Sequence, residues 1–221
     1  MVKTIRLLFI AILVIAAGLT AYAGKAWFDA GQDAPDLRAR ADELIRSGYS
    51  GADLNAATED RLAWLLGVQD PAFYAHSGVD VKTAGAGLTT VTQSLSKRIA
   101  FAEFHGGLPK IRQTVYAMRL ERVLSKEQIL ALFLDTVPMG KGPDGWMIGF
   151  FHTSQIVFNA APSEIAKDDF MKLLAVMIAP SQFDLGKDDA ALVERKRRID
   201  RLLAGKCTPE NNADVWLEGC A

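Results

Sequence analysis

The sequence is poor in the residues that build metal and redox sites. It has only two cysteines, Cys207 and Cys220, and both lie close to the C-terminus. The three histidines, His76, His105 and His152, lie far apart in the chain. The sequence therefore contains no cysteine and histidine spacing that is typical of a zinc site.

A strong net charge is missing too. The 221 residues include 25 Lys and Arg against 26 Asp and Glu, which leaves a formal charge of -1. This balance gives no general attraction to nucleic acid, so we expect no nucleic-acid partner. We also find no internal repeat, no low-complexity segment and no sustained two-residue alternation of apolar side chains, which favours one mainly helical domain.

One long apolar run lies near the N-terminus. Lys3 and Arg6 precede an uncharged stretch over residues 7–24, which is close to the ~20 residues that cross a bilayer. Cations before the run predict a cytoplasmic N-terminus and an exported domain. The Ala-Tyr-Ala sequence at 21–23 also fits a signal-peptidase site. Residues 1–25 are thus either the anchor of a single-pass inner-membrane protein or the cleaved segment of a secreted or periplasmic one.

Export gives the two cysteines a structural role. In an oxidising compartment Cys207 and Cys220 can form a disulfide, which would add on the order of 3 kcal/mol to the stability of a short loop. The sequence then divides into four parts: the anchor or signal segment at 1–25, a polar connector and short charged helix at 26–55, a main domain at 56–205, and a tail with the disulfide at 206–221.

The stretch from Val68 to Gly78 has the composition of a functional turn at the end of a helix. The preceding helix is expected to be capped by Thr58. The turn itself combines an acid, Asp70, with an aromatic residue and a histidine. The position where a catalytic carboxylate would be expected holds Gln69.

A second polar stretch follows a glycine-bearing segment at residues 79–87. Threonines, a glutamine and two cations, Lys97 and Arg98, come directly after it. Free backbone N–H groups at such a helix start, together with the cations, would suit an anionic group such as a phosphate. A helix cap followed by a solvated Lys-Arg pair would give the same pattern, and both interpretations stay open.

Helices are expected over residues 110–123, 126–135, 150–158, 168–178 and 190–203, with a glycine-rich loop at 136–149. Ser125 and Gln128 form a capping-box pattern for the second of these. The last helix is basic and amphipathic, and its cations favour a solvated face over contact with membrane headgroups.

Several stretches together resemble the family 51 glycosyltransferases, the peptidoglycan transglycosylase domain of penicillin-binding proteins and of their monofunctional relatives. The resemblance covers residues 56–203, and its motifs occur in the family's order: Gln69-Asp70-x-x-Phe73-x-x-His76-x-Gly78, then Gly87-Leu88-Thr89-Thr90-Val91-Thr92-Gln93-Ser94-Leu95-Ser96-Lys97, Pro109-Lys110-Ile111-Arg112-Gln113, and Leu120-Glu121 with Ser125-Lys126.

The resemblance implies a mainly α, lysozyme-like domain of two lobes behind the N-terminal apolar helix. It also implies polymerisation of lipid II, in which a glutamate of the first motif deprotonates the attacking sugar hydroxyl. The partners would be lipid II or a glycan strand, the membrane and a cell-wall synthase, and a divalent cation is the one cofactor that the family suggests. The family's binding positions fall here on Phe73, His76, Thr90, Thr92, Gln93, Lys97, Arg98 and Lys110, and we expect His76 to be a structural residue that holds the turn.

The chain departs from the family at both catalytic glutamates, which are Gln69 and Gln113 here. An amide has no useful basicity, and loss of a general base typically removes ~10²–10⁴ in rate. The segment between Asp80 and Gly87 is also shorter than is usual in the family, so the resemblance implies that part of the groove wall is missing.

Four readings follow. The chain could polymerise lipid II with a substitute base, for which the candidates are Asp70, Asp80, Glu103 and Glu121. It could be an inactive member that binds lipid II or glycan, or that docks on a synthase. A lysozyme-like glycan-cleaving enzyme would again need an acid at position 69. A plain membrane-anchored structural domain is the fourth reading.

Overall fold

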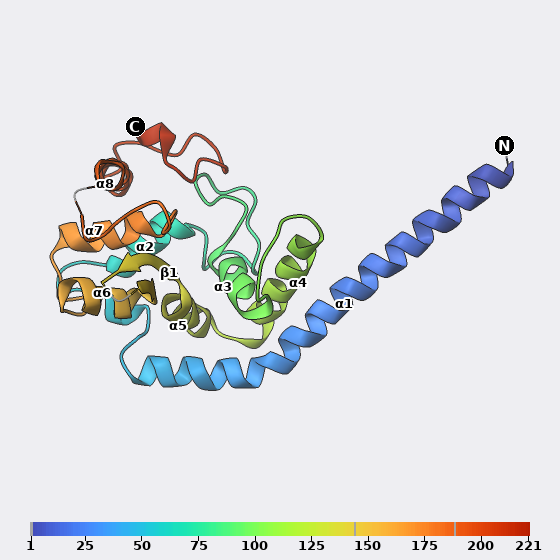
Figure 1. The fold of residues 1–221 in the computed structure, drawn as a ribbon, viewed down its shortest axis with the longest axis horizontal. Helices are drawn as coiled ribbons and strands as arrows, with labels where there is room; N and C mark the ends of the chain where they lie inside the picture. The colour runs from blue at the N-terminus through green and yellow to red at the C-terminus, as the bar shows by residue number, and fades with distance from the viewer. Residues whose placement is uncertain (1, 144, 188) are drawn as a thin grey trace.

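The computed structural model describes residues 2–143, 145–187 and 189–221, and the chain is mainly helical (Figure 1). Its elements in chain order are α1 (Val2–Arg46), η1 (Ala52–Leu54), α2 (Arg61–Gln69), α3 (Val91–Ala100), α4 (Leu108–Val123), α5 (Lys126–Thr136), β1 (Pro138–Gly142), β2 (Gly145–Ile148), α6 (Phe150–Phe158), α7 (Lys167–Val176), α8 (Ala190–Leu203) and η2 (Glu218–Cys220).

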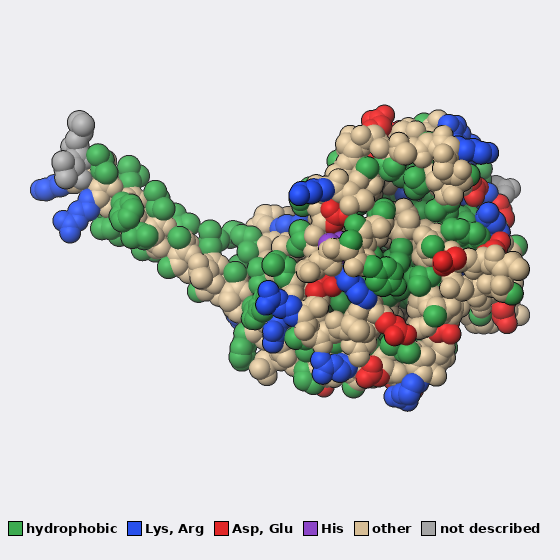
Figure 2. All heavy atoms as spheres, turned by 180° about the vertical axis from the view of Figure 1, so that it is seen from behind, with side chains coloured by type: hydrophobic (Ala, Val, Ile, Leu, Met, Phe, Trp, Pro, Cys, Tyr) green, Lys and Arg blue, Asp and Glu red, His purple; other side chains and the backbone are tan. Residues whose placement is uncertain are grey.

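The first half of α1 projects away from the rest of the molecule (Figure 1). Hydrophobic side chains cover this projecting part, and cations lie at its tip (Figure 2). Leu7 is 67% exposed and Val14 is 65% exposed, so this segment is not a core helix. Within the described residues α1 is the one helix that is long and apolar enough to cross a membrane.

The second half of α1 packs against α4 and α5, where Ala30 and Ala41 are fully buried. The connector expected at residues 27–35 is therefore helical instead. The sequence misled us because it contains a glycine and Pro35, which usually end a helix. Here Pro35 lies inside α1, which bends where it meets the domain (Figure 1), as a missing backbone donor allows.

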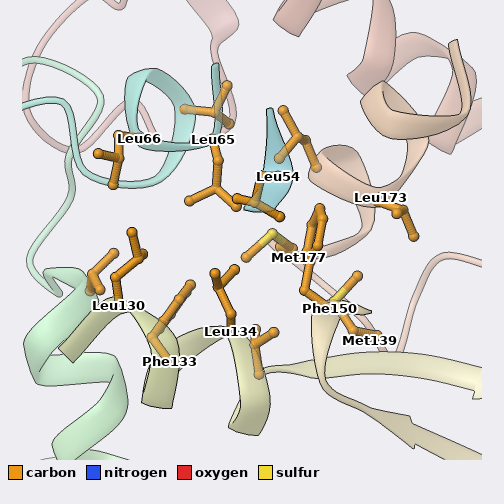
Figure 3. Close-up of a cluster of buried hydrophobic side chains, with 14 of the residues drawn as sticks. Leu54, Leu65, Leu66, Leu130, Phe133, Leu134, Met139, Phe150, Leu173 and Met177 are labelled. Carbon is orange, nitrogen blue, oxygen red and sulfur yellow. The ribbon is translucent and has the colours of Figure 1, made fainter. Parts of the chain in front are cut away.

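A single core joins the two sides of the domain. Leu130, Phe133 and Leu134 of α5 face Leu54 and Leu65 across a cluster of buried side chains (Figure 3). On one side of α5 lie α3 and α4, and on the other lie α2, α6, α7 and α8 (Figure 1). The fold is mainly α and two-lobed, as expected.

The expected loop at residues 136–149 contains a short antiparallel hairpin of β1 and β2. We missed it because its strands carry three glycines and show no two-residue alternation. Gly140 has φ +90°, and a Cβ there would lie 2.6 Å from the carbonyl oxygen of Pro180. Close backbone packing, and not side-chain patterning, therefore specifies this hairpin.

Candidate functional site

The turn after α2 is organised around Asp70, which is fully buried. Both carboxylate oxygens lie 3.0 Å from His76 Nε2, and Oδ2 also accepts a hydrogen bond from the backbone N–H of Val91 at 2.9 Å. His76 Nδ1 accepts the N–H of Gly78 at 3.0 Å, which leaves the ring proton on Nε2 to donate to Asp70. The α2 cap is Asp60, whose side chain accepts from the Ala63 N–H, and not Thr58.

Phe73 and His76 hold this turn in place. The ring of Phe73 is 1% exposed, and the ammonium of Lys126 lies 4.4 Å from its centroid. Lys126 also donates to the carbonyl oxygen of His76 at 2.9 Å. Gly78 has φ +96°, and a Cβ there would lie 3.1 Å from the backbone of Ala117. The first motif is thus packed directly on α4.

The start of α3 is satisfied within the chain. Thr90 and Gln93 form a reciprocal capping box, in which the Thr90 side chain accepts the Gln93 N–H. The Gln93 side chain also donates to Thr114 at 3.1 Å. Asp70 accepts the N–H of Val91 at 2.9 Å, and the Thr90 hydroxyl accepts that of Gln93 at 3.1 Å, so both donors are already used within the chain. Of the two interpretations left open, the helix cap is the one that the geometry favours.

Thr92 and Glu121 belong to a second buried cluster. The Glu121 carboxylate accepts a hydrogen bond from the Thr92 hydroxyl, and it forms an ion pair with Lys126 at 2.8 Å. The side chain of Glu121 is only 5% exposed. Its carboxylate therefore joins α3 to α4 and α5.

Gln113 lies in the core between α3 and α4 and is 1% exposed. Its Nε2 donates to the backbone carbonyl oxygen of Gln93 at 2.8 Å, and its Oε1 has no hydrogen-bond partner among the described residues. The Gln113 side-chain atom that faces the Gln93 carbonyl oxygen must carry a hydrogen. An ionised carboxylate in this place would repel that carbonyl, so the surroundings disfavour an ionised glutamate.

The three predicted cations have different environments. Lys97 is exposed and lies 5.1 Å from the centroid of Phe104. Lys110 donates to Leu88 O at 2.9 Å and to the Thr89 hydroxyl at 3.1 Å. Burial and the nearby charge of Lys97 lower the pKa of Lys110. Lys110 thus lies against residues 88–89, and Lys97 is close enough to act on its charge.

Arg98 is enclosed instead. Its guanidinium donates to Thr136 at 3.0 Å and to Ser94 at 2.7 Å, and it lies over the ring of Phe133. Burial lowers the pKa of Arg98 to about 10. The side chain joins α3 to α5, and it does not extend toward Gln69.

Gln69 ends α2 and is partly buried. It lines a pocket of about 420 Å³ together with its neighbour Val68 and residues from four other segments: Gly85, Ala86, Gly87, Leu88, Thr89, Ile178, Arg195, Ala213 and Val215. None of these described lining residues is an acid or a histidine. The amide of Gln69 therefore has no neighbour in the pocket that could take a proton in its place.

The candidate substitute bases lie elsewhere. Asp70 and Glu121 are held by the contacts given above. The Asp80 carboxylate accepts the N–H groups of Lys82 and Thr83 at 2.8 and 3.1 Å, which keep its pKa low even though burial acts in the opposite direction. Glu103 lies on an exposed loop. These acids line no part of the Gln69 pocket.

The residues present do not fit a divalent cation. Hard cations such as Mg²⁺ take oxygen ligands and favour carboxylates. In the described part of the chain no three Asp, Glu, His or Cys side chains come together in a way that could hold a metal ion. The polar side chains that line the pocket at Gln69 are one amide, one guanidinium and the Thr89 hydroxyl, and Gln113 is enclosed by core packing.

Sequence reasoning missed Arg195, which it assigned to a solvated face. In the structure Arg195 is 3% exposed and lies on the buried face of α8 with Leu192 and Ile199. The spacing of these three residues along the helix was the available signal. Sequence reasoning also missed that the tail lines the pocket.

Comparison with known proteins identifies the domain. A model of the family described as Transglycosylase matches residues 52–204. The chain belongs to the transglycosylase family. It is 28% identical to penicillin-binding protein 1A of Aquifex aeolicus over 159 residues, which is 70% of this chain and 21% of that relative. It is 26% identical to penicillin-binding protein 1A of Escherichia coli over 152 residues, which is 62% of this chain and 17% of that relative.

Penicillin-binding protein 1F of Bacillus subtilis gives a similar result, with 28% identity over 131 residues, which is 53% of this chain and 18% of that relative. The chain thus corresponds to about a fifth of the length of these relatives. Family membership supports a lysozyme-like fold and a cell-wall protein, and the apolar part of α1 fits a single-pass membrane helix.

Proposed function

We propose that this transglycosylase-family protein binds lipid II or nascent glycan at the groove around Gln69 and does not polymerise it. The observation that carries the proposal is the absence of a carboxylate from the described lining of the Gln69 pocket. The first-motif turn keeps its other parts, because Asp70, Phe73 and His76 are packed and hydrogen-bonded. The site therefore retains its framework without its base.

The second amide supports the same conclusion. Gln113 donates to a backbone carbonyl where an ionised glutamate would be repelled. The two positions have thus changed in the same direction, and the structure accommodates the buried one as an amide. Lys110 remains beside residues 88–89 with Lys97 close enough to act on its charge, and the two cations suit the pyrophosphate of a lipid-linked sugar.

The proposed setting is the outer face of the inner membrane. Lys3 and Arg6 precede the apolar part of α1, which favours a cytoplasmic N-terminus and an exported domain on a retained anchor. A binding protein of this kind would act beside a catalytic cell-wall synthase, because its own pocket supplies no general base.

Two assays with the full-length protein in detergent test the proposal. Lipid II should bind to the wild type, and binding should weaken in Lys110→Met more than in Lys187→Met, which changes an exposed lysine.

In a polymerisation assay the wild type should give no glycan chains. Gln69→Glu, alone and with Gln113→Glu, tests whether a carboxylate restores product, and Gln182→Glu at an exposed position is the matched control.

Restoration by Gln69→Glu would identify the missing base directly, and a base is typically worth ~10²–10⁴ in rate. Polymerisation by the wild type would refute the loss of turnover. Absence of lipid II and glycan binding would refute the binding role.

A further inference from the structure

The pocket beside Gln69 is closed on one side by the C-terminal tail, residues 206–221, in which Cys207 and Cys220 form a disulfide. The tail is docked on the shortened segment before α3 (Figure 1). The N–H of Gly85 donates to Asn211 O at 2.9 Å, and the N–H of Gly87 donates to Asn212 O at 2.8 Å.

The tail packs closely against the same two glycines. A Cβ on Gly85 would lie 2.7 Å from the side chain of Pro209, and one on Gly87 would lie 2.6 Å from Val215. The tail lies beyond the residues that match the family, 52–204. This wall of the pocket is therefore built by a segment outside the family match.

Arg195 contributes the one charge in the described lining. It is 3% exposed, and its Nε and one terminal nitrogen have no hydrogen-bond partner among the described residues. Burial lowers the pKa of the guanidinium to about 10, and the charge of Arg198 acts in the same direction. A buried cation without a partner is destabilising, so a bound anion would be favourable here.

The acids nearest to Arg195 already have partners. Asp214 and Glu218 both act on its charge. The Asp214 carboxylate accepts backbone N–H groups of residues 210, 218 and 219. Glu218 pairs with Arg198 at 2.9 Å and is 60% exposed. Neither acid forms a hydrogen bond with the Arg195 guanidinium among the described contacts.

The rest of the lining selects the kind of anion. Apart from Gln69 and Thr89 it consists of glycines and apolar side chains: Val68, Ala86, Leu88, Ile178, Ala213 and Val215. A pyrophosphate carries several charges and needs several donors. One planar guanidinium among apolar walls fits a single carboxylate better.

We propose that this pocket binds the terminal carboxylate of a peptide that ends in small apolar residues. Arg195 receives the carboxylate, the apolar walls receive the small side chains, and the amide of Gln69 hydrogen-bonds to the peptide backbone. The inference rests on the proposed function in one respect. It assigns to the pocket at Gln69 the peptide part of the cell-wall precursor that the protein is proposed to bind.

The test uses the isotope-labelled full-length protein in detergent and two probes, N-acetyl-Ala-Ala and its C-terminal amide. The acid should shift the backbone amide signals of Ala86 and Val215, and the amide should bind at least about tenfold more weakly, which corresponds to ~1.4 kcal/mol. Arg195→Met should lose at least about tenfold in affinity for the acid. Arg201→Met, on the same helix, should bind as the wild type does.

Equal binding of acid and amide by the wild type would overturn the inference, and so would unchanged affinity in a folded Arg195→Met variant. Inorganic pyrophosphate binding at the same amides more tightly than the acid would overturn the choice of a carboxylate. If Arg195→Met does not fold, Arg195→Lys keeps the charge without the planar fork and should still bind more weakly. Loss of lipid II binding with dipeptide binding intact would count against the proposed function alone.

Discussion

The change Gln113→Glu should destabilise the protein in a pH-dependent way. Gln113 Nε2 lies 2.8 Å from the carbonyl oxygen of Gln93, and the side chain is 1% exposed. A glutamate can keep this hydrogen bond only if it is protonated, because an ionised oxygen would meet the carbonyl lone pairs. Burial disfavours the ionised form as well. The folded-state pKa of the new carboxyl should therefore rise well above its unfolded value of about 4.3.

The magnitude follows from proton linkage. At low pH the carboxyl is protonated in both states, and the variant should have nearly wild-type stability. Above pH ~4.3 the unfolded chain loses the proton while the folded chain keeps it, so the free energy of unfolding falls by about 1.4 kcal/mol per pH unit. If the folded pKa is at or above 7, the loss at pH 7 reaches about 3.7 kcal/mol.

Denaturant unfolding of the full-length protein in detergent between pH 4 and pH 8 measures this loss. Wild type and Gln182→Glu, an exposed position, serve as controls, and the difference from wild type removes the pH dependence of all other groups. A loss below about 1 kcal/mol at pH 7, or one that does not change with pH, would refute the reasoning. The buried site would then accept a carboxylate as readily as an amide.

Three further changes test the framework around the pocket. Asp70→Asn should lower the free energy of unfolding by about 1.5–3 kcal/mol, because it removes the charged acceptor of the buried hydrogen bond from neutral His76, whereas Asp36→Asn at an exposed position should change it by less than about 0.5 kcal/mol in the same denaturation assay. Gly87→Ala should displace the tail and shift its amide signals, since the new Cβ would lie 2.6 Å from Val215 at φ +69°, while Gly106→Ala meets nothing within 4 Å. Reduction of the tail disulfide should lower stability by about 3 kcal/mol, and unchanged unfolding after reduction would contradict a structural role.

Much of the fold could be predicted from local patterns. The apolar run of α1, the capping box of Ser125 and Gln128, and the spacing of α8 are each visible within a few residues. The helical path of residues 27–35 was not visible, because packing of α1 on α4 overrides the preference of Pro35 to end a helix. Tertiary contacts decided this segment, and no local pattern reports them.

The motifs of the candidate site could be predicted from the sequence, but the surroundings of each site residue could not. The motifs gave the positions of Gln69 and Gln113. They could not show that Gln113 is enclosed while Gln69 lines a pocket. Nor could they show that Arg98 is bound between α3 and α5 while Arg195 is left without a hydrogen-bond partner among the described residues. Whether a charge is free to bind depends on contacts between segments far apart in the sequence.

The segment before α3 and the amide at position 69 are linked through the tail. Glycines at 85 and 87 let the tail approach the backbone closely enough to form hydrogen bonds. The tail then adds the side chains of Ala213 and Val215 to the pocket that Gln69 lines together with Arg195. An ionised carboxylate at position 69 would line this pocket together with Arg195 and would compete with an anionic ligand for the guanidinium. A neutral amide does not compete for the guanidinium, so Gln69 leaves Arg195 available to the proposed anionic ligand.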